Sequence, residues 1–113
     1  MSRICNVVTL LIAVLTAVAA LPATAQPSRL KVVATFSILG DFVRAVGGDR
    51  IDLITLVGPN GDAHVYSPTP ADGRQLAEAK VVVANGLGFE GWISRLVTAS
   101  GTRAKVVEAA AGV

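Results

Sequence analysis

The hydrophobic positions of this sequence alternate between short continuous runs and runs with helical spacing. Continuous runs of four to eight residues rich in β-branched side chains are typical of buried strands. Four such runs are present, and they span Leu30–Phe36, Ile51–Val57, Lys80–Asn85 and Ala104–Glu108. Because segments with a helical pattern lie between them, the chain is predicted to alternate strand and helix along its length.

The first and third helices are predicted from apolar stripes. Ser37 is placed to cap the first helix, and Gly47 and Gly48 are placed to end it. Ser100 and Gly101 close the third helix. The stripe residues are Ile38, Leu39, Phe42, Val43 and Val46 in the first helix, and Trp92, Ile93, Leu96 and Val97 in the third.

The second helix is predicted from its start signal. Thr69 is a cap residue, Pro70 suits the first helical position, and Asp72 stands where a capping carboxylate is found. The helix is expected to run to about Ala79 and to be weakened by Gly73.

This order of elements predicts an α/β fold, a parallel β-sheet joined by right-handed crossovers. The continuous apolar strands indicate that helices cover both faces of the sheet. In such sheets, ligands bind outside the carboxyl ends of the strands. The loop from Gly58 to Thr69 and the sequence GLGFEG, Gly86 to Gly91, both leave from that edge. The only histidine, His64, is therefore expected on the functional edge.

The first 25 residues have the pattern of a cleavable secretory signal. An uncharged apolar run, Val7 to Ala20, is followed by Pro22 and by the small-x-small motif Ala23–Ala25. A transmembrane anchor is the alternative, because Ile4 to Leu21 is nearly long enough to span a bilayer. The proline and the cleavage motif favour a signal peptide over residues 1–25, cleavage after Ala25 and a mature chain of residues 26–113.

Composition excludes several classes of site. The only cysteine, Cys5, lies inside the predicted signal, so the mature chain has neither a disulfide nor a thiolate metal site. Removing Arg3 takes the formal net charge from +2 to about +1, and the remaining charges are scattered singly. We therefore expect no nucleic-acid partner.

His64 is a candidate metal ligand. Imidazole is the commonest metal ligand, and prolines at positions 68 and 70 stiffen the loop that carries it. Asp62, two residues earlier, could either ligate the same ion or hold the unligated ring nitrogen. A surface histidine without a metal is the alternative, because one histidine with scattered carboxylates does not complete a site.

The GLGFEG sequence supports a rival hypothesis, a dinucleotide site. It follows a strand, opens a helix, and has Glu108 22 residues beyond Gly86, near the spacing of about 20 at which an acidic residue binds the ribose. Against it, Glu90 would place a carboxylate where the pyrophosphate should lie, and Trp92 would crowd the helix–strand packing. The structural alternative is a tight glycine turn, with Glu90 favouring the helix dipole and Trp92 in the core.

Catalysis has little support. Ser67 is the only nucleophile near His64, and it precedes a proline and lacks a glycine elbow. The carboxylates show no spacing that would pair them for acid–base chemistry. We expect a protein that is not an enzyme.

Three segments resemble one known family. GPNGDAHVYSPTPAD, Gly58 to Asp72, resembles the first metal-ligand loop of the zinc/manganese solute-binding proteins of ABC transporters, the cluster A-I family. NGLGFEGW, Asn85 to Trp92, resembles the turn after the next strand in that family, and Val32 to Pro59 resembles its opening strand–helix–strand. Together these segments cover most of the mature chain in the family's order.

The resemblance implies that His64 is the first metal ligand. The family completes its site with a second histidine in the same lobe, and with a histidine or glutamate and an aspartate from a second lobe. This sequence has no other histidine and stops at Val113, which implies a truncated first part of the N-terminal lobe. Ala63 and Ser67 depart from the common proline and glutamate without removing the ligand. The glycine turn is structural in this family.

The resemblance also implies a function. We expect a periplasmic, monomeric protein that captures Zn²⁺ or Mn²⁺ and delivers it to an ABC-transporter membrane permease. With one imidazole, the chain itself is expected to bind metal weakly or not at all. The alternatives are an adhesin-like interaction module that binds no metal and, with less support, a dinucleotide-binding fragment.

Overall fold

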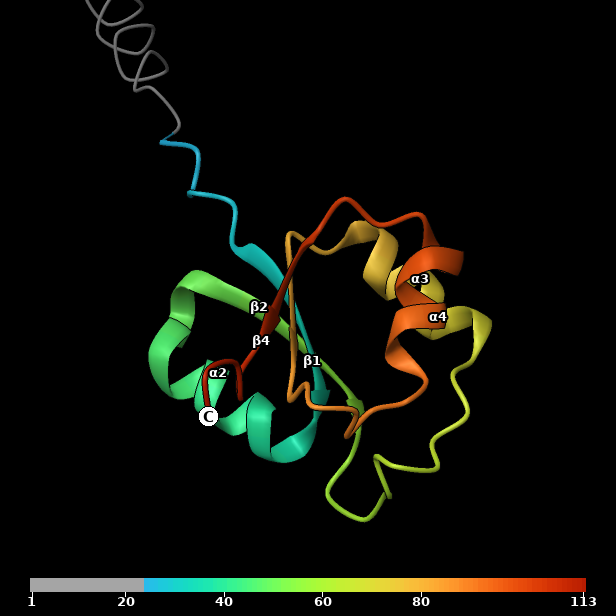
Figure 1. The fold of residues 1–113 in the computed structure, drawn as a ribbon. Coiled ribbons are helices and arrows are strands. Elements are labelled where there is room, and N and C mark those ends of the chain that lie inside the picture. Colours follow the sequence, from blue (N-terminus) through green and yellow to red (C-terminus); the bar gives the residue numbers. More distant parts are fainter. Residues whose placement is uncertain (1–23) are drawn as a thin grey trace, which may run out of the picture.

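Four parallel strands form one sheet in the order β2-β1-β3-β4 (Figure 1). The computed structural model describes residues 24–113, so the predicted signal peptide, apart from its last two residues, lies outside the described part. The strands are β1 (Leu30–Phe36), β2 (Ile51–Val57), β3 (Val81–Ala84) and β4 (Lys105–Glu108), and the helices are α2 (Ser37–Gly47), α3 (Pro70–Glu78), α4 (Ile93–Ser100) and a short 3-10 helix (Gly48–Arg50). The predicted α/β fold with a parallel sheet is confirmed.

The strand order places a crevice at the carboxyl edge of the sheet. β1 leads through α2 to β2 on one side, whereas β3, the other neighbour of β1, leads through α4 to β4 on the opposite side. The chain therefore leaves β1 and β3 in opposite directions, which opens a space between the two connections. The loop after β2 returns across this space on its way to α3.

Helices cover the two faces of the sheet, as predicted. Figure 1 shows α2 on one side and α3 with α4 on the other. Helix α2 contacts β1 and β2, and a Cβ atom on Gly40 would lie 2.5 Å from Thr55 Oγ1, so glycine allows this helix to approach the sheet. Helices α3 and α4 contact each other as well as the sheet.

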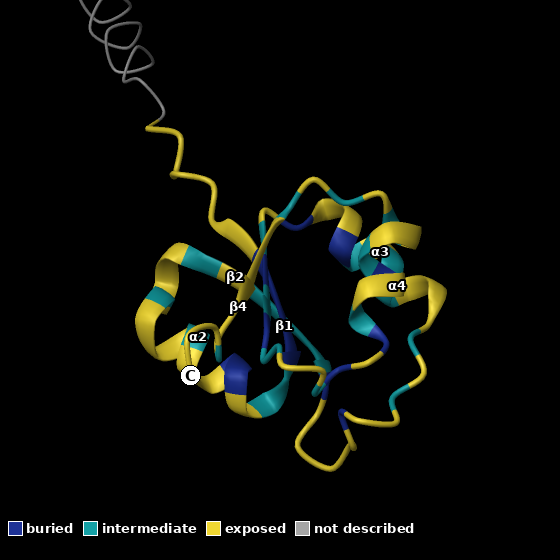
Figure 2. Ribbon diagram, in the orientation of Figure 1, coloured by how far each residue is buried: buried dark blue, intermediate teal, exposed yellow. Residues whose placement is uncertain are grey.

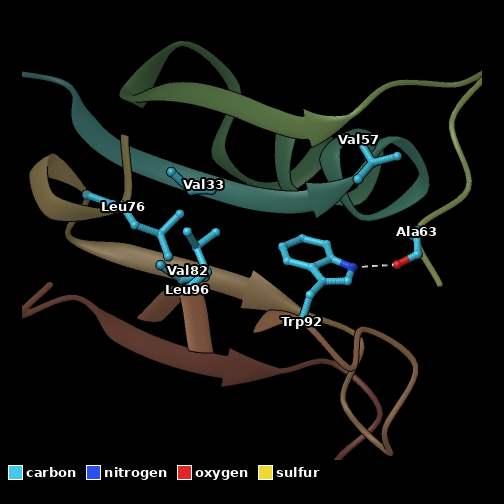
Figure 3. Packing of buried hydrophobic residues seen from close by; sticks show 8 residues of the cluster. Val33, Val57, Ala63, Leu76, Val82, Trp92 and Leu96 are labelled. Carbon is cyan, nitrogen blue, oxygen red and sulfur yellow. Dashed lines mark hydrogen bonds between the residues drawn. The ribbon is translucent and has the colours of Figure 1, made fainter. Parts of the chain in front are cut away.

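The main core lies between the sheet and the α3–α4 pair. Figure 2 shows the buried residues concentrated in the middle of the sheet and on the inner side of these two helices. Figure 3 shows side chains from both strands and helices meeting there. The buried cluster consists of Val33, Val57, Ala63, Leu76, Ala79, Val82, Trp92 and Leu96. The prediction that Trp92 is a core residue is thus confirmed.

The start and the outer face of α2 differ from the expectation. Ser37 is the first residue of the helix rather than its cap, Phe36 occupies the cap position, and within residues 24–113 no side chain caps this helix. The strand runs directly into the helix, which leaves no extended residue after Phe36 for a serine cap. Of the apolar stripe, Leu39 is buried, whereas Phe42 is 64% exposed and Val46 80% exposed.

Strand β4 also differs from the expectation of strands covered on both faces. All four of its residues are exposed, because within the described part of the chain β4 pairs with β3 alone and lies at the edge of the sheet. The Val–Val pair at its centre made it look like an interior strand in the sequence.

The predicted start of α3 is confirmed in detail. Thr69 Oγ1 accepts a hydrogen bond from the backbone N–H of Asp72, and the Asp72 carboxylate accepts one from the backbone N–H of Thr69. Gly101, with φ of 63°, ends α4 as a left-handed C-cap.

Among residues 24–113, no helix is both long enough and apolar enough to cross a membrane.

Candidate functional site

The loop between β2 and α3 carries the candidate ligand and folds back onto the end of the sheet. It begins with a turn in which the backbone N–H of Gly61 donates to Gly58 O at 3.0 Å. A side chain at position 61 would collide with Val57, because a Cβ atom there would lie 2.6 Å from Val57 Cγ1. The loop thus turns tightly enough to bury Ala63, the residue next to His64.

Trp92 fixes the middle of this loop. The indole lies in the core, and its Nε1 donates to the carbonyl oxygen of Ala63 at 2.6 Å (Figure 3). Because the bond is buried and joins residues 29 positions apart in the sequence, it ties the histidine loop to the segment that leads into α4.

His64 itself lies at the surface, and its imidazole is held from one side. Asp62 Oδ1 accepts a hydrogen bond from the backbone N–H of His64 at 2.9 Å and lies 3.1 Å from the ring nitrogen Nδ1. These hydrogen bonds, first the backbone one and then the ring one, lower the pKa of the Asp62 carboxyl below its usual value. The imidazole side chain is 61% exposed, and its Nε2 makes no hydrogen bond within residues 24–113.

A second hydrogen-bonded group holds the far end of the loop. The hydroxyl of Tyr66 donates to Asp72 Oδ2 at 2.9 Å, and its ring meets Trp92 edge-on with the centroids 5.1 Å apart. Burial, and then the Asp72 carboxylate, raise the pKa of Tyr66 above its usual value. The Asp72 carboxylate therefore accepts the hydrogen bond from Tyr66 and also caps α3.

The histidine loop borders an open cavity of about 400 Å³ at the carboxyl edge of the sheet. The end of β1, the start of α2 and the turn after β3 supply the other walls. The lining residues are Phe36, Ser37, Ile38, Gly58, Pro59, Asn60, Gly61, Asp62, Ala63, His64 and Phe89. The cavity therefore lies in the crevice that the strand order creates, where the sequence predicted the functional edge.

The glycine turn after β3 does not have the geometry of a dinucleotide site. The Glu90 carboxylate is buried, at 3% exposure, and accepts hydrogen bonds from the backbone N–H groups of Asn85 at 2.7 Å and Gly86 at 3.2 Å. These are the donors that a phosphate in the turn would need. The structural alternative, a tight glycine turn, is therefore the arrangement that is observed.

The expected role of Glu90 at a helix dipole is wrong. Helix α4 begins at Ile93, and its first turn contains no acidic residue. The Glu90 carboxylate accepts hydrogen bonds from the turn and from Thr35 Oγ1 of β1. Glu108, the proposed ribose ligand, packs against Gly86, where an added Cβ would lie 3.0 Å from Glu108 Cβ.

The donor set fits part of a metal site. Asp62 and His64 are the side chains lining the cavity whose type is common among metal ligands, and within residues 24–113 no group of three or more His, Cys, Asp or Glu side chains could hold an ion together. The described residues therefore offer one well-placed imidazole with a carboxylate on its other nitrogen. That arrangement is the usual one for a histidine ligand.

Several residues that shape the site were not identified from the sequence as parts of it. The Ala63 carbonyl, the Phe89 ring and the Glu90 carboxylate lie around His64 or support its neighbours. The contacts of Ala63 with Trp92, of His64 with Phe89 and of Glu90 with Thr35 join residues that are distant in the sequence, so no local signal could have revealed them. The Tyr66–Asp72 bond spans six residues, and a capping carboxylate near a tyrosine was a signal that the sequence did contain.

Known proteins resemble this chain in both sequence and structure. It is 41% identical over 78 residues to the iron ABC transporter substrate-binding lipoprotein MtsA of Streptococcus pyogenes, covering 66% of this chain and 25% of that protein. It is 41% identical over 68 residues to the manganese-binding lipoprotein MntA of Halalkalibacterium halodurans, covering 60% and 23%. The chain thus spans about a quarter of the length of these curated relatives.

The structural comparisons agree. The Mn-bound periplasmic metal binding protein from Candidatus Liberibacter asiaticus superposes with a TM-score of 0.69 at 28% identity, over 75% of this chain and 32% of that one. The Zn(II)-bound AdcA from Streptococcus pneumoniae shares the fold, with a TM-score of 0.66 at 24% identity, over 74% and 18%.

A family assignment follows from the sequence match that covers most of the chain. The family described as zinc-uptake complex component A, periplasmic, matches residues 32–113, which include both loop motifs and all four strands apart from the first two residues of β1. Members of this family are substrate-binding components of transport systems. The chain therefore belongs to the zinc-uptake component A family, the ABC-transporter metal-binding proteins that its histidine loop and glycine turn predicted.

Proposed function

We propose that this chain takes part in the capture of Zn²⁺ or Mn²⁺ outside the cytoplasmic membrane and in its delivery to an ABC-transporter permease. His64 contributes one ligand through Nε2. Family membership supports the transport role, and the relatives named for manganese and iron, together with the Mn-bound and Zn-bound structures, support a divalent ion as the cargo.

One observation carries the proposal, the position of Asp62 beside His64. With the ring proton on Nδ1, Asp62 Oδ1 at 3.1 Å accepts it, and Nε2 then presents its lone pair outwards. A carboxylate on the unligated nitrogen fixes the tautomer and raises the basicity of the ligating one. Asp62 therefore acts as an orienting partner here, rather than as a second ligand.

The number of donors sets the expected strength of binding. Zinc sites that hold their ion tightly use three or four protein ligands. Since Asp62 only orients His64 in this proposal, and the described residues contain no group of three or more ligating side chains, we expect weak binding by this chain. A tight site requires further donors, and their chemistry selects the metal, because imidazole favours zinc and carboxylate oxygen favours manganese.

Export is part of the same proposal. Residues 1–25 act as a signal peptide that is cleaved after Ala25, and residues 26–113 form part of an N-terminal metal-binding lobe. The mature chain is a monomer in the periplasm. It has no enzymatic role in this proposal, because its part is to bind an ion and release it to the permease.

A Zn²⁺ titration followed by NMR tests the metal site. In the chain we expect the His64 ring signals to shift saturably, with a dissociation constant above about 1 µM. His64→Ala should abolish the saturable response, and Asp62→Asn should weaken it, because the amide holds the ring less strongly. Binding that persists unchanged in His64→Ala would contradict the proposed ligand. A submicromolar constant would contradict the argument from donor number.

A further inference from the structure

The His64 ring contacts an aromatic side chain from a different part of the fold. The Phe89 ring lies with its centroid 4.1 Å from the imidazole centroid, and the two ring planes are inclined by 57°. Both residues line the same cavity. Asp62 holds one nitrogen of the imidazole, and Phe89 lies against the ring itself. These two contacts restrict different motions of an otherwise exposed side chain.

The position of Phe89 is fixed by an unusual turn. Gly86, Leu87 and Gly88 have φ angles of 82°, 56° and 76°, so three consecutive residues occupy the left-handed region. The turn is closed by a hydrogen bond from the backbone N–H of Phe89 to Gly86 O at 3.1 Å. The Phe89 ring also packs against Phe36 at the end of β1, with centroids 5.1 Å apart. Phe89 therefore contacts both the end of the sheet and the histidine.

A buried carboxylate holds this turn against the sheet. Glu90, the residue after Phe89, accepts hydrogen bonds from Thr35 Oγ1 in the middle strand β1 and from the backbone N–H groups of Asn85 and Gly86. We call this group the Glu90 clip. Because the Glu90 clip joins β1, the end of β3 and the turn, it restrains the backbone of the segment that carries Phe89.

We propose that Phe89 is a positioning residue for His64, and that the Glu90 clip holds Phe89 in place for this task. The two elements restrict the rotamers of His64 before an ion arrives, so that less side-chain freedom is lost on binding. The inference rests on the proposed function for its purpose, although its structural part concerns the metal-free chain.

The first test measures the metal-free chain, and its result does not depend on the metal hypothesis. Three-bond couplings and proton shifts of His64 report its χ1 distribution and the ring current of Phe89. In Phe89→Ala we expect the couplings to average over several rotamers and the ring-current shift to disappear. Phe42→Leu, a change to an exposed phenylalanine on α2, is the control and should leave His64 unchanged. Unchanged couplings in Phe89→Ala would overturn the proposal.

The second test concerns the clip, which does not touch His64. Glu90→Gln replaces one of the two acceptor oxygens with an NH2 group, which cannot accept a hydrogen bond from a backbone N–H. The clip is thereby weakened, and we expect the His64 couplings to average over several rotamers in this variant too. If Glu90→Gln is shown by circular dichroism to be unfolded, Thr35→Val removes one donor of the clip with little change in shape. A folded clip variant with the couplings of the parent chain would overturn the role of the clip.

A Zn²⁺ titration of the same variants connects the two proposals. Phe89→Ala should raise the dissociation constant of the His64 site about 3- to 10-fold, with Phe89→Leu between it and the parent chain. If His64→Ala leaves Zn²⁺ binding intact, the proposed function fails, while the metal-free couplings still decide the positioning role. Averaged rotamers with unchanged Zn²⁺ affinity would overturn the claim that positioning serves binding.

Discussion

Trp92 Nε1 donates a hydrogen bond to the carbonyl oxygen of Ala63 at 2.6 Å, and both residues are buried. The bond joins the segment before α4 to the residue beside His64, across the carboxyl edge of the sheet (Figure 3). The bond anchors the backbone beside the exposed His64 to a buried residue of the core. A loop residue is thereby positioned with the precision that usually comes from helices and strands.

Trp92→Phe should destabilise the protein by about 2–4 kcal/mol, because the smaller ring leaves a cavity and the Ala63 carbonyl loses its buried donor. Urea unfolding followed by circular dichroism measures this change, since the substitution removes the chain's only tryptophan. The control Phe42→Leu alters an exposed side chain and should stay within about 0.5 kcal/mol of the parent. If the two variants were equally stable, the buried bond would have no structural importance.

Gly86→Ala should lower the free energy of unfolding by about 1–2 kcal/mol, because φ of 82° is strained for any residue with a Cβ. The added methyl group would also lie 3.0 Å from Glu108 Cβ. Gly73→Ala, inside α3 with open space around it, is the matched control and should stabilise the chain by about 0.5–1 kcal/mol. Chemical denaturation measures the free energy of unfolding of both variants, which should change in opposite directions. A stabilising Gly86→Ala would contradict the left-handed conformation of this turn.

Tyr66 should titrate above its ordinary pKa of 10.0, because burial, and then the Asp72 carboxylate, favour the neutral phenol. Since the folded-state pKa is the higher one, this group's contribution to stability is complete below pH 10.0 and is lost as the pH rises through the folded-state pKa. The ultraviolet absorbance of phenolate measures it directly, because Tyr66 is the only tyrosine. Asp72→Asn should lower the pKa while leaving it raised by burial, and a Tyr66 pKa at or below 10.0 in the folded parent would contradict the buried contact.

Export should yield a protein that begins at Gln26. Intact-mass measurement of the secreted product checks the cleavage after Ala25, which follows from the small residues at positions 23 and 25. Ala25→Leu should block cleavage and leave the leader attached, whereas Thr24→Ser, at the position between the two small residues, should be processed normally. An exported parent chain that stayed in the membrane fraction with residues 1–25 attached would favour the membrane-anchor alternative.

The fold could be predicted from the sequence because its signals are local. The runs that became β1 and β2 have the observed bounds, and Thr69 with Asp72 formed the expected capping box. Apart from the Ser37 cap, the failures concern how far an element is covered rather than its periodicity. An apolar stripe indicates a helix but not how much of the stripe is covered, so the exposure of Phe42 and Val46 could not be foreseen. The same reason explains the exposed strand β4.

The candidate site was only partly predictable. The position of His64 at the sheet edge follows from element order alone, and the pairing with Asp62 follows from a spacing of two residues. The environment of Glu90 was out of reach, because its partner Thr35 lies 55 positions earlier and neither residue type indicates burial. The sequence places this carboxylate close to the start of α4, whereas its hydrogen bonds go to the sheet and to its own turn.

The parallel sheet also bears on how quickly this protein can assemble. Leu30 pairs with Ile51, and Val32 pairs with Val81, so strand partners lie roughly 20 to 50 residues apart and none of the strand pairs in residues 24–113 is a hairpin. Each pairing requires the closure of a long stretch of chain before its contacts can form. We therefore expect this protein to fold on the slower timescale of α/β domains with many non-local contacts. Strand β1 is central to this process, because both β2 and β3 must pair with it in the correct register.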